Sequence, residues 1–214
     1  MFCIAKLPRN LVAEEWICKV KVNRIIEKTT SEGPGVRFCI YFQGCDIRCK
    51  GCANKEMWDF NGGVDIEVST VLKKINKIKN EICGITFLGG EPTCQAKDAA
   101  QIAQFAKKQN LNVILFSGNR YEELVSSGDE NVIDLLSNTD LLIDGKFEQT
   151  LLDYSRPLCG SSNQRFFYLT DAISSKEIEK NINRYEVVID RNGVIKVNGM
   201  GDLEKIQKII DTRV

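Results

Sequence analysis

The stretch GPGVRFCIYFQGCDIRCKGCANKEMWDF, residues Gly33 to Phe60, decides the class of this chain. It opens with a run of apolar and β-branched residues, Val36–Gln43, which predicts a buried strand. Cys45, Cys49 and Cys52 follow this strand in the pattern C-x3-C-x2-C. Because three thiols share one short loop, the sequence predicts that their sulfurs surround a single metal centre.

Zinc and an iron-sulfur cluster are the two candidates for this centre. A structural zinc ion is closed by four ligands, usually as two separated pairs, and the chain has no second pair. Zinc stays open as the alternative, because each lone cysteine offers a fourth ligand: Cys3, Cys18, Cys39, Cys83, Cys94 and Cys159. An ordinary cluster takes four cysteines, so three leave one iron open to a small molecule. S-adenosylmethionine (SAM) offers an amino group and a carboxylate to such an iron.

The composition excludes several kinds of chemistry. The chain of 214 residues contains no His, which rules out His general bases, Ser-His-Asp triads and His-ligated zinc. Basic and acidic residues balance at 29 each, so no net charge attracts nucleic acid or an anionic membrane. No apolar run approaches the roughly 20 residues of a membrane span, and Met1–Asn10 lacks the apolar core of a signal peptide. We therefore expect a cytoplasmic protein with reduced thiols, and no nucleic-acid or membrane partner.

Strands and helices alternate after the cysteine loop. Amphipathic or Ala-rich patterns predict helices over Glu67–Asn80, Gln95–Gln109 and Tyr121–Ser137. Short apolar runs predict the intervening strands Ile85–Leu88, Asn112–Phe116 and Leu141–Ile143. This alternation predicts βαβ units, a parallel sheet and an α/β fold.

The two ends of the chain depart from this alternation. Further strands and a short helix are predicted at Trp16–Val22, Arg165–Leu169 and Ser174–Asn181. Tyr185–Asp190 and Val194–Val197 flank an Asn-Gly pair, which is the signature of a two-residue hairpin turn. Asp202 then caps a predicted last helix over Leu203–Thr212.

Unusual residues fall directly after the predicted strands. Besides the cysteines they are Gly89, Gly90, Glu91 and Pro92 after one strand, Ser117 and Gly118 after the next, and Asp144 and Lys146 after a third. Taken singly, such residues are turns, caps or solvated charges. In α/β sheets, however, loops at the carboxyl ends of the strands converge on one face, so we expect these motifs to meet in space.

The cysteine spacing and the Gly-Gly-Glu-Pro motif together resemble the radical SAM superfamily. Gly33–Phe60, and the stretch LLIDGKFEQTLLDYSRPLCGSSNQR at Leu141–Arg165, resemble more closely the activating enzymes of anaerobic ribonucleotide reductase. These activases share Gly51 before the last cysteine. With ITFLGGEPT and LFSGNRYEEL in between, the likeness runs in order over roughly residues 33 to 170, far more than one short motif. Pro157–Cys159 departs from the family pattern.

The resemblance implies a partial (β/α)6 barrel at residues 33–184. Residues 1–32 would form an N-terminal extension packed on this core, and residues 185–214 a β-hairpin plus helix. Cys45, Cys49 and Cys52 would hold a 4Fe-4S cluster that cleaves SAM to methionine and a 5′-deoxyadenosyl radical. The radical would take hydrogen from a glycine Cα of a partner such as anaerobic ribonucleotide reductase. A low-potential donor such as flavodoxin or ferredoxin would supply the electron.

The resemblance also implies a SAM site along the strand ends. Contacts are expected from Gly89, Gly90, Glu91, Ser117, Asp144, Lys146 and Asn163. Glycine at 89 and 90 lets a ligand approach the backbone without a Cβ in the way. Trp58 and Phe60 would cover the cluster with an apolar shell. Two other functions stay open: a radical SAM enzyme that modifies a small molecule, nucleotide or peptide directly, and a non-enzymatic iron-sulfur or zinc protein.

Overall fold

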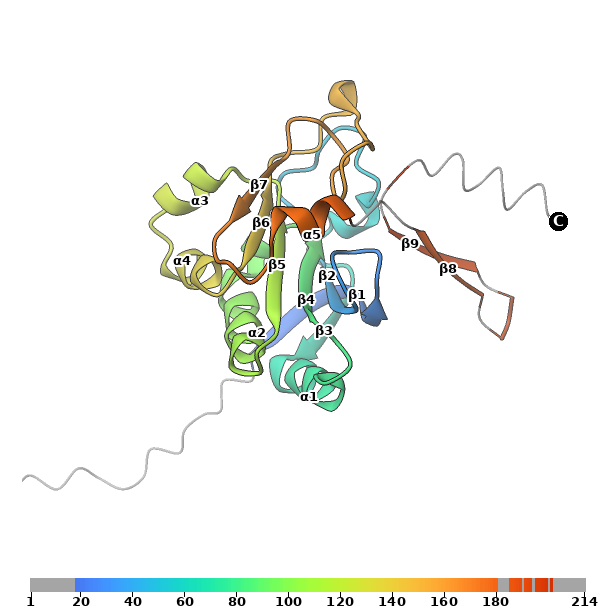
Figure 1. Ribbon diagram of the computed structural model, residues 1–214, viewed down its shortest axis with the longest axis vertical. Helices are drawn as coiled ribbons and strands as arrows, with labels where there is room; N and C mark the ends of the chain where they lie inside the picture. The colour runs from blue at the N-terminus through green and yellow to red at the C-terminus, as the bar shows by residue number, and fades with distance from the viewer. Residues whose placement is uncertain (1–17, 181–184, 190, 194, 200, 202–214) are drawn as a thin grey trace, which may run out of the picture.

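The computed structural model describes residues 18–180, 185–189, 191–193, 195–199 and 201 of the chain. Its main feature is a seven-stranded sheet in the order β3-β1-β2-β4-β5-β6-β7 (Figure 1). The strands are β1 (Lys19–Thr29), β2 (Arg37–Phe42), β3 (Val64–Glu67), β4 (Gly84–Gly89), β5 (Asn112–Ser117), β6 (Leu141–Asp144) and β7 (Arg165–Tyr168). A separate hairpin consists of β8 (Tyr185–Ile189) and β9 (Ile195–Gly199).

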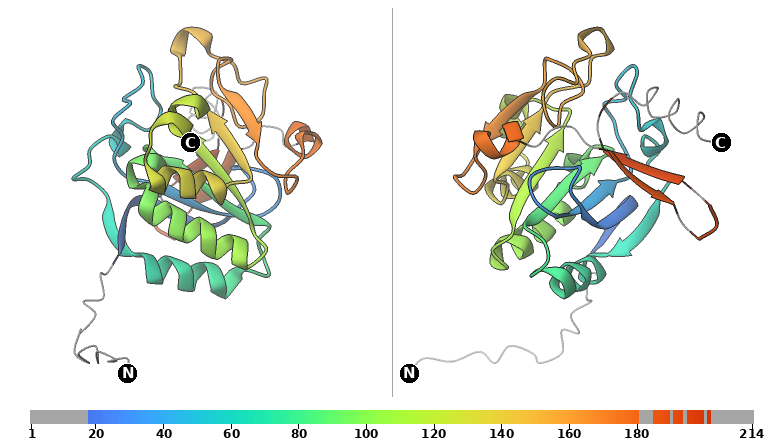
Figure 2. Two further views of the ribbon diagram at one scale, coloured as in Figure 1. Left: turned by 90° about the vertical axis from the view of Figure 1, so that its left-hand side faces the viewer. Right: turned by 45° about the vertical axis from the view of Figure 1, so that its right-hand side comes forward.

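Helices cover both faces of the sheet, most of them on one side (Figure 2). The α-helices are α1 (Val68–Ile78), α2 (Ala96–Lys108), α3 (Tyr121–Ser126), α4 (Glu130–Ser137) and α5 (Ser175–Lys180). Short 3-10 turns are η1 (Lys55–Met57), η2 (Pro92–Gln95) and η3 (Gln149–Leu151). The helices and strands expected from the periodicity between residues 67 and 144 are thus present, and the α/β class is confirmed.

The centre of the sheet is parallel. β2 pairs with β4, β4 with β5 and β5 with β6, all in parallel. Their carboxyl ends lie along one edge, the upper edge in Figure 1, where the cysteine loop and the segment after β6 also lie. This arrangement positions the functional motifs, as the pattern of residues after strands predicts.

The expected six-strand parallel repeat is wrong for the described residues. β1 runs antiparallel to both β2 and β3, and β7 runs antiparallel to β6. A parallel return needs a crossover, usually a helix on the sheet face. Residues 145–164 between β6 and β7 contain only the turn η3 and stay near the upper edge, so β7 runs back down beside β6 (Figure 1). With β3 and β7 at its two ends, the sheet is open.

Alternate residues of the parallel strands pack into different cores. On the side of α1, α2 and α4, the core includes Phe38, Ile40, Phe42, Ile85, Phe87, Val113 and Leu115. On the opposite side the residues between them face inward, and Ile114 and Ile143 pack with Ile178 of α5. The strand period of two therefore buries both faces, as parallel sheets require. Small side chains at Ala99, Ala103 and Ala106 let α2 approach the sheet closely.

The ends of the chain differ from their predicted form in extent. The first strand continues to Thr29 and pairs directly with β2, so it belongs to the sheet itself. β3 was not expected, because its four residues include two acidic side chains and are mostly exposed, so no apolar run marks the strand. The predicted hairpin is confirmed, but its two-residue turn is wrong: Ile189 pairs with Ile195, so the register is centred on Asn192 and an odd number of residues joins β8 to β9. The predicted helix Leu203–Thr212 and its cap lie outside the described residues, and the division at residues 32 and 184 stays a prediction.

None of the described helices has the length and apolar character needed to cross a membrane.

Candidate active site

A cavity of about 450 Å³ opens at the carboxyl ends of the parallel strands. Its lining brings together most of the residues singled out in the sequence: Cys45, Cys49, Cys52, Gly89, Gly90, Glu91, Ser117 and Gly118. Gly145 also lines it, whereas Asp144, Lys146 and Asn163 do not belong to the described lining. The motifs after β2, β4 and β5 therefore do meet, as expected, and the motif after β6 meets them through its backbone.

The cysteine loop is anchored to the turn that follows it. Gly44 donates from its backbone N to the Met57 carbonyl oxygen over 2.8 Å, and Cys45 N donates to Trp58 O over 3.2 Å. The loop bends through positive φ at Arg48 and at Gly51. These two bends, together with the anchors, hold all three thiols on the cavity wall.

The environment of the sulfurs is partly buried and provides backbone donors. Burial raises the pKa of Cys45, while the backbone N–H groups of Arg48 and Ile47 lower it. Cys52 Sγ accepts a 3.4 Å hydrogen bond from Asn54 N. Hydrogen bonds of this kind set the potential of a cluster bound to such sulfurs.

The three thiols line one wall of the cavity. A structural zinc ion would need a fourth protein ligand at about 2.0 to 2.3 Å, whereas each cysteine of a 4Fe-4S cluster binds a different iron and three cysteines leave one iron open. The wall of the same cavity also holds Trp58, whose buried indole Nε1 has no hydrogen-bond partner in the described structure. An unsatisfied donor beside three thiols indicates that the cavity is built for a polar ligand.

The Gly-Gly edge packs against the cysteine loop. Gly90 N donates to Phe42 O over 2.8 Å, and Glu91 N donates to Gly44 O over 2.9 Å. A Cβ on Gly90 would stand 2.9 Å from the carbonyl carbon of Gly44, so no side chain fits there. Glycine is therefore required at position 90 because the cysteine loop lies so close to it. A contact with the SAM amino group stays a prediction.

Glu91 is a buried structural carboxylate, and the option of a solvated charge is wrong. Its side chain is only 1% exposed. It accepts hydrogen bonds from Thr93 N and Oγ1 at 3.0 and 2.7 Å, from Ser117 Oγ at 3.0 Å and from Gly118 N at 2.8 Å. Burial raises the pKa of Glu91, and these donors oppose the shift. The carboxylate thus joins the end of β4 to the end of β5 at the wall of the cavity.

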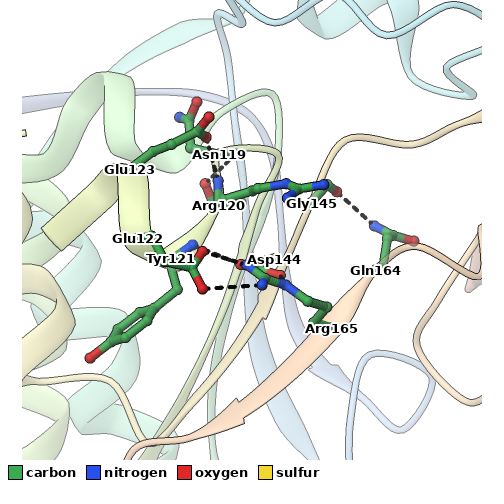
Figure 3. A network of polar contacts seen from close by, with 10 residues as sticks. Asn119, Arg120, Tyr121, Glu122, Glu123, Asp144, Gly145, Gln164 and Arg165 are labelled. Atoms are coloured by element: carbon green, nitrogen blue, oxygen red, sulfur yellow. Dashed lines mark hydrogen bonds and ion pairs between the residues drawn. The ribbon is translucent and has the colours of Figure 1, made fainter. Parts of the chain in front are cut away.

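Asp144 lies beside the cavity in a network with Arg165 (Figure 3). The Asp144 carboxylate is fully buried and accepts from Arg165 Nε at 2.9 Å and from Tyr121 N at 2.7 Å. Arg165 also pairs with Glu122 at 2.7 Å. Asp144 therefore fastens β7 and the first residue of α3 to the end of β6, and its charge is already satisfied by protein groups.

Lys146 and Asn163, here called the rim, lie next to the lining residue Gly145 but outside the described lining itself. Asn163 Nδ2 donates to the Lys146 carbonyl oxygen over 2.8 Å. Its buried Oδ1 has no partner among the described groups. Lys146 is exposed, and its charge is one of the influences that oppose the raised pKa of the half-buried Cys49. The rim thus offers an unsatisfied acceptor and a cation close to the cysteine loop.

Sequence reasoning missed a polar wall of the same cavity. It consists of Arg24, Glu32, Tyr41 and Asn198, which line the same cavity. Tyr41 Oη donates to Glu32 Oε1 over 2.7 Å and also bonds Asn198 Oδ1, and the Arg24 guanidinium stacks 3.9 Å above the Tyr41 ring. Burial raises the pKa of Glu32 to about 7, although the hydrogen bond with Tyr41 acts to lower it. Strand alternation around Cys39 places Tyr41 on the inner face, whereas no sequence signal pointed to the other three.

The fold and the cavity define an α/β protein with a three-cysteine cluster site at the carboxyl edge of a parallel sheet. A profile of the family described as "4Fe-4S single cluster domain" matches residues 31–167. The chain belongs to this family, and the expected membership of the radical SAM superfamily is confirmed.

Curated relatives support the closer resemblance to activases. Pyruvate formate-lyase 1-activating enzyme of Escherichia coli (strain K12) is 31% identical over 166 residues, 74% of this chain and 64% of that protein. The anaerobic ribonucleoside-triphosphate reductase-activating protein of Enterobacteria phage T4 is 27% identical over 146 residues, 66% of this chain and 89% of that protein. Its counterpart in Pasteurella multocida (strain Pm70) is 30% identical over 146 residues, 64% and 90% of the two chains. The chain thus spans slightly less than two thirds of the first relative.

Among solved structures, QueE from Escherichia coli matches 47% of this chain at 15% identity with a TM-score of 0.40, too low a similarity to establish the fold.

Proposed function

We propose that this chain is a radical SAM enzyme that generates a glycyl radical on a partner polypeptide. The observation that carries the proposal is the convergence of three thiols, a Gly-Gly strand end and the end of β5 on one cavity, in a chain of the 4Fe-4S single cluster family. The named activities of the relatives, which act on pyruvate formate-lyase and on anaerobic ribonucleoside-triphosphate reductase, agree with it.

The three cysteines would hold the cluster and leave one iron open to SAM. When bound, the cluster supplies the electron that cleaves SAM into methionine and a 5′-deoxyadenosyl radical. An external low-potential donor, such as flavodoxin or ferredoxin, must provide this electron. The protein itself positions the thiols, because Gly44 and Cys45 are anchored to the η1 turn and the Gly90 edge is packed beneath them.

The loops after β5 and β6 would bind SAM. Ser117 and Gly118, held by Glu91, present hydroxyl and backbone groups to the cavity. Asn163 Oδ1 and the Lys146 ammonium would take polar groups of the ligand, since the first lacks a partner and the second offers a cation. Asp144 acts as a positioning residue in this scheme, because Arg165 and Tyr121 N occupy its carboxylate.

Direct modification of a small molecule, nucleotide or peptide is the second candidate. Its support is the polar wall of Arg24, Glu32 and Tyr41, which faces the cavity and is closed on one side by Asn198 of the hairpin. Such a wall excludes water and offers charged groups to a small polar substrate. The two candidates differ in the molecule that loses hydrogen, not in the cluster or in SAM.

Reductive SAM cleavage tests the part that both candidates share. Anaerobically reconstituted protein, given reductant and SAM, is expected to release 5′-deoxyadenosine, measured by liquid chromatography and mass spectrometry. When pyruvate formate-lyase or anaerobic ribonucleoside-triphosphate reductase from the same organism is added, the amount of 5′-deoxyadenosine released should equal the amount of glycyl radical formed on that partner. Zinc in place of iron, or no deoxyadenosine at any reductant concentration, would contradict radical SAM chemistry.

A further inference from the structure

The β8-β9 hairpin has two chemically different faces. Its pairing places Glu186 opposite Asn198 and Val187 opposite Val197. Because side chains alternate along a strand, Glu186, Val188 and Asn198 share one face. The other face, here called the apolar hairpin face, consists of Tyr185, Val187, Ile189, Ile195, Val197 and Gly199.

The polar face fastens the hairpin to the body of the protein. Glu186 Oε1 accepts from Thr30 N at 2.8 Å and from Thr30 Oγ1 at 3.1 Å. Asn198 Nδ2 donates to Ser31 Oγ over 2.9 Å, and its Oδ1 bonds Tyr41 Oη. These contacts use the base of the hairpin and orient its polar face toward the loop between β1 and β2. The hairpin then projects from the body, as the right-hand view of Figure 2 shows.

The apolar hairpin face is largely uncovered in the described structure. Val187 is 50% exposed, Ile189 66% and Ile195 41%. A two-stranded hairpin is marginally stable by itself, and neighbouring exposed apolar side chains mark a binding surface. Of the described strands, β8 and β9 pair only with each other, so each also keeps one edge open for hydrogen bonding.

This face leads into the candidate active site. Val197 and Gly199, which belong to the same face, line the cavity that also holds Cys45, Cys49 and Cys52. The apolar side chains therefore form a continuous strip from solvent to the place where hydrogen would be abstracted. A polypeptide that places its glycine in the cavity must contact the surface next to the cavity, and the apolar hairpin face is part of that surface.

We propose that the apolar hairpin face is the docking surface for the polypeptide substrate, which binds as an extended segment with apolar side chains. The inference rests on the proposed function, because it takes the substrate to be a polypeptide. An extended segment suits the site in two ways: alternate apolar side chains match Val187, Ile189 and Ile195, and its backbone can pair with an open strand edge. The alternative occupants are residues 202–214 of this chain, which follow the hairpin in the sequence and include Leu203, and a second copy of the protein.

Two valines on opposite faces provide a matched test. Val187 and Val188 are 50% and 57% exposed, so Val187→Ser and Val188→Ser remove similar area from different faces. The probes are pyruvate formate-lyase and anaerobic ribonucleoside-triphosphate reductase from the same organism, added to the reconstituted full-length enzyme. We expect Val187→Ser to weaken probe binding and to raise the KM for radical formation, and the double variant Val187→Ser with Ile189→Ser to do so by about tenfold or more. Val188→Ser should match wild type, and SAM cleavage without a probe should be unchanged in all variants.

The outcomes separate this inference from the proposed function. If wild type forms the radical and Val187→Ser with Ile189→Ser binds the probe as tightly, the docking surface is wrong while the activase function stands. If wild type binds neither probe and forms no radical, both are wrong. If Ile206→Ser in the full-length protein raises hydrogen exchange across residues 185–199, the apolar hairpin face is covered by the end of this chain. Concentration-dependent dimerisation that Val187→Ser abolishes would assign it to a second copy, and either result overturns the inference.

Discussion

Gly90, which directly follows β4, lies so close to Gly44 that a Cβ on Gly90 would stand 2.9 Å from the Gly44 carbonyl carbon and closer still to its oxygen. The hydrogen bond from Glu91 N to Gly44 O, 2.9 Å long, holds the two segments together. The strand end and the start of the cysteine loop therefore behave as one unit. A change in either should be felt by all three thiols.

We predict that Gly90→Ala destroys the cluster site, because the added methyl group overlaps backbone atoms that cannot rotate away. Iron content and the visible absorption of the reconstituted protein should fall to a small fraction of wild type. Gly128→Ala is the control: nothing lies within 4 Å of a Cβ there, and only its φ of +71° is strained. It should cost about 1 kcal/mol of stability and keep the cluster. Full iron loading in Gly90→Ala would contradict the packing described here.

Replacing any of Cys45, Cys49 or Cys52 with Ala should abolish the iron-sulfur cluster. Cys94 provides the control, because its exposed thiol lies beside the loop and donates to Asp46 Oδ1 at 3.3 Å. Burial and the Asp46 carboxylate raise the pKa of Cys94 to about 12, which disfavours the thiolate that a metal requires. Cys94→Ala should therefore retain wild-type iron and its EPR signal after reduction. Loss of the cluster in this variant would identify Cys94 as a fourth ligand and remove the open iron.

Arg165→Leu should destabilise the protein by about 2 kcal/mol, because it leaves the buried Asp144 carboxylate with Tyr121 N as its remaining donor. Glu122→Gln changes the exposed partner of the same guanidinium and should cost much less, because solvent screens an exposed ion pair. Denaturant unfolding of the three proteins measures both effects. Equal losses in the two variants would show that Asp144 does not depend on Arg165.

Glu32 should make stability depend on pH. Its folded pKa of about 7 lies above the ordinary value of 4.5, so the folded protein keeps a proton that the unfolded chain releases. This contribution is fully present below about pH 4.5 and is lost as pH rises toward 7. From pH 4.5 to 7 the free energy of unfolding of wild type should fall by roughly 3 kcal/mol through this group. Glu32→Gln cannot ionise and still accepts from Tyr41, so the variant should not show this fall. Parallel profiles for wild type and variant would refute the shift.

Strand ends and thiol spacing were the most predictable features. The apolar runs at Ile85–Leu88 and Asn112–Phe116 are typical of parallel strands, and the residues after them do meet on one cavity. Their positions follow from local pattern alone, since parallel strands end on one edge. The role of Glu91 was not predictable, because its burial depends on the loop after β5 folding over it.

The direction of β7 and the polar wall of the cavity depend on contacts between residues that are far apart in the sequence. The (β/α)6 barrel that the resemblance implies requires parallel strands, but no helical pattern separates β7 from β6, so no crossover is available and β7 runs antiparallel. Asn198 reaches Tyr41 across 157 positions of sequence, and Arg24 stacks on the same ring. Periodicity reports the face of a strand but not the segment that covers it, so this wall emerged only from the fold.

The most direct test of the central claim is EPR spectroscopy of the reconstituted enzyme mixed anaerobically with reductant, SAM and a glycyl-radical partner candidate. We predict a doublet from a glycyl radical on the partner, lost when the partner glycine becomes Ala and absent with Cys45→Ala. Deoxyadenosine formed in proportion to a modified small molecule, with no radical on any polypeptide, would contradict the claim.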